Sequence, residues 1–307
     1  MKKLLPFTWL LPVVAFIVVL SGCMKDRISK TYQVMRPVYA DKAVVFANVK
    51  SGPVEEMDKP GKIFIRGNYL FINEVNKGVH IYNNSKPSAP QPVSFISIPG
   101  NIDVASSGHY LYADMYTDML TLDIQDPLNA RLVDTSLNVF PERYYNGWTP
   151  DNSKVIVDWE ITDTTVSSDQ VDRWLGGGCM SCDFFAVPQS SGSEKAAYIP
   201  GIAGSMARFA IVNEYLYAVN NSSLVVFDIH NEAAPERKSE NMIGWQIETV
   251  YPFRNNLFIG SSSGMFIFDI DQPALPELKG SFVHARACDP VISDGEYAFV
   301  TLRSGDA

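Results

Sequence analysis

One module of about forty residues recurs along the chain, and this repeat restricts the possible folds more than any other feature. Each copy begins with a turn and an apolar strand, and a short polar turn then leads into a second apolar strand. The first-strand copies are residues 67–72, 108–113, 213–218, 295–300 and a variant at 255–260. The second-strand copies are residues 78–83, 120–124, 224–229 and 265–270. Proline follows each complete copy, and proline cannot continue a hydrogen-bonded ladder.

The spacing of the copies indicates the architecture. Aligned on Tyr69, Tyr110, Tyr215, Leu257 and Tyr297, the copies are separated by 41, 105, 42 and 40 residues. Three of these intervals match the length of a four-stranded propeller blade. Both strands are near-continuous apolar runs, as expected for strands covered on both faces. We therefore predict an all-β fold, a β-propeller of four-stranded blades.

An aspartate ends the second strand in three copies, at Asp123, Asp228 and Asp269. Aspartate at a turn can accept hydrogen bonds from nearby backbone amides. Because the residue recurs in equivalent places, a folding role is favoured over a catalytic or calcium-binding one.

The repeat strands Leu-Val-Val-Phe-Asp at 224–228 and Leu-Thr-Leu-Asp at 120–123 resemble those of the LVIVD-repeat β-propeller lipoproteins of Bacteroidetes. The resemblance covers residues 61–134 and 206–307. It implies a propeller on an exported lipoprotein, but it says little about chemistry.

The first 23 residues have the pattern of an export signal. Lys2 and Lys3 precede an apolar run at 4–20, and Leu20-Ser21-Gly22-Cys23 follows. This tetrapeptide resembles the bacterial lipobox, which implies lipidation of Cys23. A transmembrane anchor is the alternative, but 17 apolar residues are at the short limit for spanning a bilayer. Met24, by resemblance to lipoprotein sorting signals, favours the outer membrane, on either its periplasmic side or the cell surface.

These features predict a signal peptide at 1–22, a lipidated tether and short N-terminal segment at 23–60, and a propeller at 61–307. A short helix is expected at 41–50 with Asp41 as its N-cap. The 105-residue interval predicts an insertion at about 135–205, with a strand at 153–161 and a loop at 162–193, although a degenerate blade is an alternative. The last blade contains only its first strands, which predicts that the chain is a fragment of a longer protein.

Motifs of hydrolytic and metal chemistry are weak in this sequence. Residues 260–264 read Gly-Ser-Ser-Ser-Gly, but a strand follows where a nucleophile elbow needs a helix, so a hairpin turn is expected. Cys179 and Cys182 are predicted to form a disulfide, with free or redox-active thiols and a metal site as alternatives. Cys288 lacks a partner in the sequence. Four histidines lie in repeat strands, turns or linkers without metal-ligand spacing: His80, His109, His230 and His284.

Aromatic residues gather in or beside the predicted insertion. They are Tyr144, Tyr145, Trp148, Trp159 and Trp174. Such rings can stack on sugars or peptides, so they are the candidate ligand-binding residues. In the competing interpretation they pack the insertion onto the propeller.

The charge composition limits the class of partner that the protein can bind. The net charge is −9 and no basic stripe is present, so a nucleic-acid partner is not expected. Because no catalytic residue, metal site or cofactor motif stands out, we expect an envelope scaffold that binds a protein or glycan. The alternative is a glycan-active or lactonase-like enzyme on a propeller scaffold.

Overall fold

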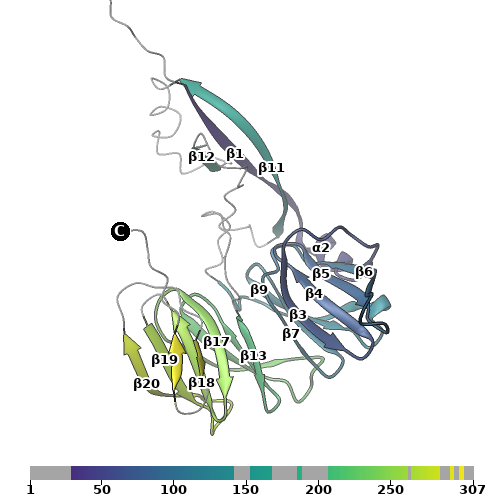
Figure 1. Cartoon of the computed structure of the whole chain (residues 1–307). Helices are drawn as coiled ribbons and strands as arrows, with labels where there is room; N and C mark the ends of the chain where they lie inside the picture. Colours follow the sequence, from purple (N-terminus) through teal and green to yellow (C-terminus); the bar gives the residue numbers. More distant parts are fainter. Residues whose placement is uncertain are drawn as a thin grey trace, which may run out of the picture. The chain divides into compact units, whose positions relative to one another are not determined.

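A computed structural model describes residues 29–141, 153–167, 185–188, 207–261, 264–283, 291–293 and 297–300 (Figure 1). The chain divides into two compact units. One comprises Met1–Arg36 with Glu160–Ala197, and the other comprises Pro37–Trp159 with Tyr198–Ala307. In the described ranges, no helix has the length and apolar character needed to span a bilayer.

The larger unit is a succession of antiparallel sheets (Figure 1). Sheet 1 has the order β2-β6-β5-β4-β3, from β2 (Ser51–Gly52), β3 (Pro60–Arg66), β4 (Tyr69–Glu74), β5 (Gly78–Asn83) and β6 (Gln91–Ser97). Sheet 2 contains β7 (Val104–Ser107), β8 (Tyr110–Met115), β9 (Asp118–Asp123) and β10 (Arg131–Ser136), with a 3-10 turn, η2 (Pro127–Asn129), before β10.

Sheets 3 and 4 repeat the pattern. Sheet 3 contains β13 (Phe209–Val212), β14 (Tyr215–Val219), β15 (Ser223–Asp228) and β16 (Glu236–Met242). Sheet 4 contains β17 (Ile247–Phe253), β18 (Asn256–Ser261), β19 (Gly264–Asp269) and β20 (Glu277–Val283), and a further pair follows, β21 (Val291–Ser293) with β22 (Ala298–Val300). The prediction of a propeller of four-stranded blades is confirmed, and the sheets of the described residues do not close a ring.

The sheets share one register. In sheets 1 to 3, counted along the chain in four-stranded blades, the tyrosine that begins the second strand (β4, β8 or β14) lies opposite the last residue of the third strand (β5, β9 or β15). The pairs are Tyr69–Asn83, Tyr110–Asp123 and Tyr215–Asp228. In sheet 4 the residue opposite Asp269 is Asn256, so the predicted alignment on Leu257 was wrong by one residue. The reason is that Arg254 holds the left-handed turn position in sheet 4, with φ 53°. Gly67, Gly108 and Asn213 hold that position in the other sheets.

The recurring aspartates cap turns as predicted. Their carboxylates accept hydrogen bonds from the amide two residues later, and Asn83 does the same in sheet 1. The N–O distances are 2.9 Å for Gln125 on Asp123, 3.0 Å for His230 on Asp228, 2.6 Å for Asp271 on Asp269 and 2.9 Å for Ser85 on Asn83. This turn directs the chain from the third strand toward the fourth.

Apolar cores lie between successive sheets. Phe71 of sheet 1 and Leu122 of sheet 2 belong to the first core, which we call core 1. The next two cores hold sheets 2 and 3 and then sheets 3 and 4 together. Tyrosine hydroxyls reinforce two of these contacts, because Tyr112 donates to the Glu232 carbonyl and Tyr217 to the Pro273 carbonyl, both at 3.0 Å.

The smaller unit holds a sheet of different connectivity, with the order β11-β1-β12. Its strands are β1 (Ser29–Asp41), β11 (Lys154–Ser167) and β12 (Phe185–Pro188), and the longer two extend into the larger unit. Within the predicted insertion, the strands of the described residues 153–167 and 185–188 thus belong to the sheet of β1 and form no four-stranded sheet. Residues 29–41, assigned to the tether from the sequence, are a strand, and the predicted loop at 162–193 contains the end of β11 and all of β12.

The expected short helix is α2 (Lys42–Asn48). Asp41 is its N-cap residue, but the Asp41 side chain makes no capping hydrogen bond in this helix. The helix instead follows directly from β1, and the Lys42 amide donates to the Ser153 carbonyl at 2.9 Å. A hydrogen bond to the residue directly before β11 therefore holds the first residue of this helix.

Candidate functional site

The insertion leaves and re-enters the propeller at one end of its sheets. We call this end the hairpin end, because the tight turns between the second and third strands lie there. Strands in each sheet are antiparallel, so β10 finishes at the hairpin end and β13 starts from it. Loops over a rigid scaffold commonly carry function, which makes the hairpin end the candidate site.

A buried carboxylate, Asp103, joins three sheets at this end. Asp103 is 1% exposed. The Lys62 ammonium of sheet 1 lies 2.7 Å from its Oδ1. The backbone amides of Arg208 and Phe209, at the start of sheet 3, donate to its Oδ2 at 2.7 and 3.1 Å.

A second carboxylate, Asp114, lies beside Asp103. Its Oδ1 accepts from the amides of Ile102 and Asp103 at 2.7 and 3.0 Å and from the Asn101 side chain at 2.8 Å. Burial raises the pKa of Asp103, the Asp114 charge raises it further, and the Lys62 ammonium opposes both. Adjacent carboxylates can perform acid–base chemistry, but these two are engaged by donors of the chain itself. Their geometry fits a role in joining the sheets.

Glu74 and His80 form a second buried pair, 0% and 2% exposed. His80 Nε2 lies 3.0 Å from Glu74 Oε2, and the amides of Asp58 and Lys59 donate to the same carboxylate at 3.1 and 2.9 Å. Burial disfavours ionisation of Glu74, but these amides, His80 and Lys77 together outweigh it and lower the pKa of Glu74. The pair fastens the segment between β2 and β3 onto sheet 1.

Replacing Glu74 with glutamine is expected to lower the free energy of unfolding at pH 7 by about 1.5–3 kcal/mol, because hydrogen bonds to a charged acceptor are lost. The lowered pKa means that the carboxylate stabilises the fold above its ordinary value of 4.5, and that this contribution fades as the pH falls below it. Urea unfolding at pH 7 and pH 3 measures the difference in the free energy of unfolding between wild type and variant at each pH. A difference between wild type and variant that stays constant with pH would contradict this assignment.

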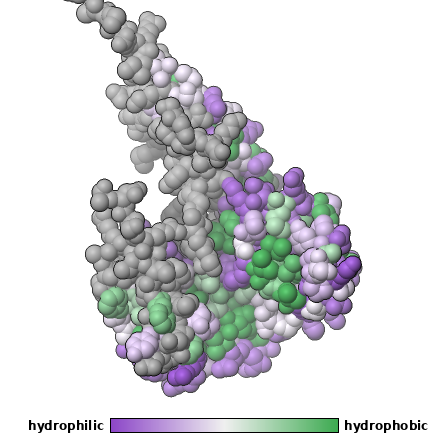
Figure 2. Space-filling model, in the orientation of Figure 1, coloured by the Kyte–Doolittle hydropathy of each residue, from purple (hydrophilic) through white to green (hydrophobic). Residues whose placement is uncertain are grey.

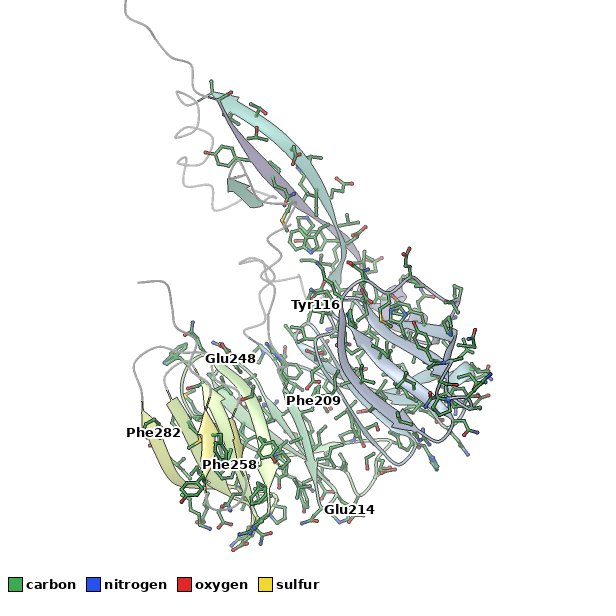
Figure 3. All side chains as sticks on the ribbon, viewed as in Figure 1. Tyr116, Phe209, Glu214, Glu248, Phe258 and Phe282 are labelled. Atoms are coloured by element: carbon green, nitrogen blue, oxygen red, sulfur yellow. The ribbon has the colours of Figure 1, made fainter. Side chains whose placement is uncertain are left out.

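A third set of contacts joins α2 and β11 to the hairpin of sheet 2. Lys42 forms an ion pair with the buried Asp118. The Tyr116 hydroxyl donates to the Ile156 carbonyl (Figure 3). The backbone of Tyr116 is left-handed, with φ 51°. The hairpin end of sheet 2 is thereby fixed to the first strand of the insertion.

Exposed apolar side chains follow the outer strands at the hairpin end. Met242 ends β16 and is 85% exposed, and Trp245, three residues later, is 75% exposed. Leu137, directly after β10, is 59% exposed. Sequence reasoning missed these residues, because a repeat pattern does not distinguish an exposed tryptophan from a buried one. Large exposed apolar groups are typical of interaction surfaces.

Of the predicted aromatic site, only Trp159 lies within the described residues. Trp159 belongs to β11, and its partly buried ring packs against core 1. The other candidates lie outside the described residues: Tyr144, Tyr145, Trp148 and Trp174. Cys23, Cys179, Cys182, Cys288 and His284 also lie outside them.

The Gly-Ser-Ser-Ser-Gly segment joins two paired strands, as expected. Ser261 of β18 pairs with Gly264 of β19, and its hydroxyl donates to the Gly264 carbonyl at 3.0 Å. A paired strand therefore follows where a nucleophile elbow needs a helix, so the segment does not match that motif. Within the part of the chain that the structure describes, no group of three or more His, Cys, Asp or Glu side chains could hold a metal ion.

A known structure supports the architecture. A protein of Lactobacillus plantarum aligns with a TM-score of 0.51 at 10% identity, over 90% of this chain and 76% of that one. The periplasmic gluconolactonase of Pseudomonas aeruginosa gives 0.46 at 11% identity, over 74% and 55% of the two chains. The β-propeller domain of Cps50 (Swd1) from Myceliophteria thermophila gives 0.38 at 13% identity, over 83% of each. At 10% identity, the alignment with the Lactobacillus plantarum protein supports a likeness of fold alone.

No curated protein sequence matches the chain. The LVIVD repeat family matches residues 60–94, which run from β3 into β6, and residues 203–241, which include most of sheet 3. Both matches coincide with sheets that share the register described above. The protein is therefore a β-propeller protein that carries LVIVD repeats.

Proposed function

We propose that the protein is an outer-membrane lipoprotein, anchored through Cys23, whose propeller binds an envelope protein or glycan and performs no catalysis. The exposed Trp245 and Met242 at the hairpin end are the observation that carries the binding role. The buried carboxylates at the same end of the sheets, Asp103 and Asp114, accept hydrogen bonds from the chain itself and support a structural role. The lipobox-like sequence before Cys23 supports the anchor.

Photo-crosslinking in cells tests the binding role. A benzoylphenylalanine at position 245 is expected to give a discrete protein or glycan adduct, because Trp245 is 75% exposed at the hairpin end. Leu128, also exposed but in the η2 turn at the opposite end of sheet 2, is the matched control. Equal labelling from both positions, or no adduct from position 245, would refute a binding surface there.

Metabolic labelling with a palmitate analogue tests the anchor. Wild type is expected to incorporate the label and to fractionate with the outer membrane, whereas Cys23→Ser should lose both, since the acylated thiol is removed. Cys288→Ser provides the control for cysteine loss in general. Label retained in Cys23→Ser would overturn the anchoring proposal without affecting the crosslinking result.

A further inference from the structure

The strand β1 begins a short distance along the chain from the proposed lipidation site. Ser29, the first residue of β1, follows Cys23 by six residues. Six residues span at most about 20 Å, even when the chain is fully extended. With Cys23 acylated in a bilayer, as proposed above and as this inference requires, the beginning of β1 is held within about 20 Å of the lipid surface.

Three strands of the smaller unit meet where β1 begins. Thr31 Oγ1 of β1 lies 3.1 Å from Thr165 Oγ1, near the end of β11. On the other side of β1, Tyr32 pairs with Pro188, the last residue of β12. The beginning of β1 and the ends of β11 and β12 therefore lie together, and we call this region the anchor end of the sheet.

Negative charge on β11 lies away from the anchor end. Glu160 and Asp163 are both exposed. The described residues that follow Asp163 are 164–167, Thr-Thr-Val-Ser, and none of them carries a charge. The surface over the end of β11 is accordingly pale, and strongly hydrophilic surface follows further along the strand (Figure 2). An uncharged end thus adjoins an acidic stretch of the same strand.

The sequence next to Cys23 has the opposite charge. Residues 24–30 contain three cations, Lys25, Arg27 and Lys30, and one anion, Asp26, so that their net charge is +2. The net charge of the chain is −9. The surface of a bilayer with anionic lipids attracts basic segments beside it, and it repels acidic side chains by the same field. Such a bilayer therefore favours the residues that adjoin the anchor end over the acidic stretch of β11.

We propose that the anchor end is the membrane-facing surface of the smaller unit, and that Glu160 and Asp163 hold the rest of β11 away from an anionic bilayer. The partner of this surface is the headgroup layer of the membrane that contains the acylated Cys23. The sheet thus stands on its anchor end and does not lie flat on the lipid. The ligand proposed for the hairpin end has no part in this contact.

Energy transfer to lipid headgroups tests this orientation. A donor fluorophore is attached at Thr165→Cys or at Ile161→Cys, two exposed positions on one face of β11. The full-length protein keeps the acylated Cys23 and has serine at its other cysteines, Cys179, Cys182 and Cys288. In vesicles of phosphatidylethanolamine and phosphatidylglycerol with headgroup acceptors, the transfer rate from position 165 should exceed that from position 161 at least about twofold, because the two positions are roughly 13 Å apart along the strand.

Flotation with the vesicles, measured first, separates the anchor from the orientation. Protein that does not float would refute the anchor and this orientation together. Protein that floats but transfers equally from both positions, or more strongly from position 161, would overturn the orientation and leave the anchor in place. Thermal unfolding shows beforehand that each labelled protein is folded.

The double variant Glu160→Lys/Asp163→Lys tests the role of the charges. Attraction then replaces repulsion, so β11 should approach the lipid and transfer from position 161 should rise at least about twofold. Glu236→Lys/Glu240→Lys, at two exposed positions of β16, makes the same change in net charge and should leave the transfer unchanged. No response to the β11 variant, or an equal response to both, would overturn the role proposed for Glu160 and Asp163.

Discussion

Asp103→Ala is expected to lower the free energy of unfolding by about 3 kcal/mol, because backbone amides lose a charged, buried acceptor and each unsatisfied buried donor costs about 1–3 kcal/mol. The substitution leaves the Lys62 ammonium without its carboxylate and removes the acceptor for the amides of Arg208 and Phe209. Three sheets lose a shared contact, so urea unfolding should also become less cooperative.

Two further variants show what Asp103 contributes. Asp103→Asn keeps oxygen and size but loses the charge, so its loss of stability should be smaller than that of alanine. Lys62→Met should also cost less, because Lys62 is 34% exposed at its side chain and Asp103 keeps its amide donors. If Asp103→Ala costs no more than about 1 kcal/mol, the three-sheet contact carries little of the stability.

Gly78→Ala is the second large expected effect, a loss of about 3 kcal/mol, from overpacking together with backbone strain. Gly78 begins β5 with φ 146°, a conformation that side chains rarely adopt. An added Cβ would also overlap the Ile96 carbonyl oxygen and lie 2.8 Å from the Ile98 amide. Both contacts are backbone atoms, one within β6 and one in the residue that directly follows it, and they cannot move without disturbing the sheet.

Differential scanning calorimetry measures the loss for Gly78→Ala, and Gly67→Ala, measured in the same way, separates the two causes. Gly67 also has a positive φ, 54°, but an added Cβ there would meet no atom within 4 Å. Only conformational strain remains, so a loss of about 1 kcal/mol is expected. Equal losses for both variants would show that the overlap at Gly78 is relieved by local adjustment.

The repeated strands could be predicted from the sequence because they are local structures. Tyr110 and its partner Asp123 are close in the chain, and their apolar runs and capping turns recur in each copy. The one-residue error at Leu257 arose where Arg254 replaces the glycine or asparagine that marks the turn elsewhere. The strand β1 was missed because its partners, β11 and β12, lie more than a hundred residues away.

The polar contacts at the hairpin end were not predictable for a related reason. Sheets 1, 2 and 3 each have one contributing residue directly before the same register position of their first strand: Lys62, Asp103 and Arg208. These three residues differ in type and share no motif. Only the register of the sheets shows that a cation and two amides meet one carboxylate. The exposure of Trp245 likewise depends on packing, which a single sequence does not record.

The pairing of β1 with β11 sets an order of events during synthesis. Roughly 110 residues separate Asp41 from Lys154, so β1 emerges about 6–20 seconds before its partner at ordinary rates of translation. Sheets 1 and 2 lie entirely within that gap and can form first, while β1 is still a single strand able to pair with other chains. Nascent copies held by a chaperone at this stage should therefore present residues 29–41 as the exposed segment.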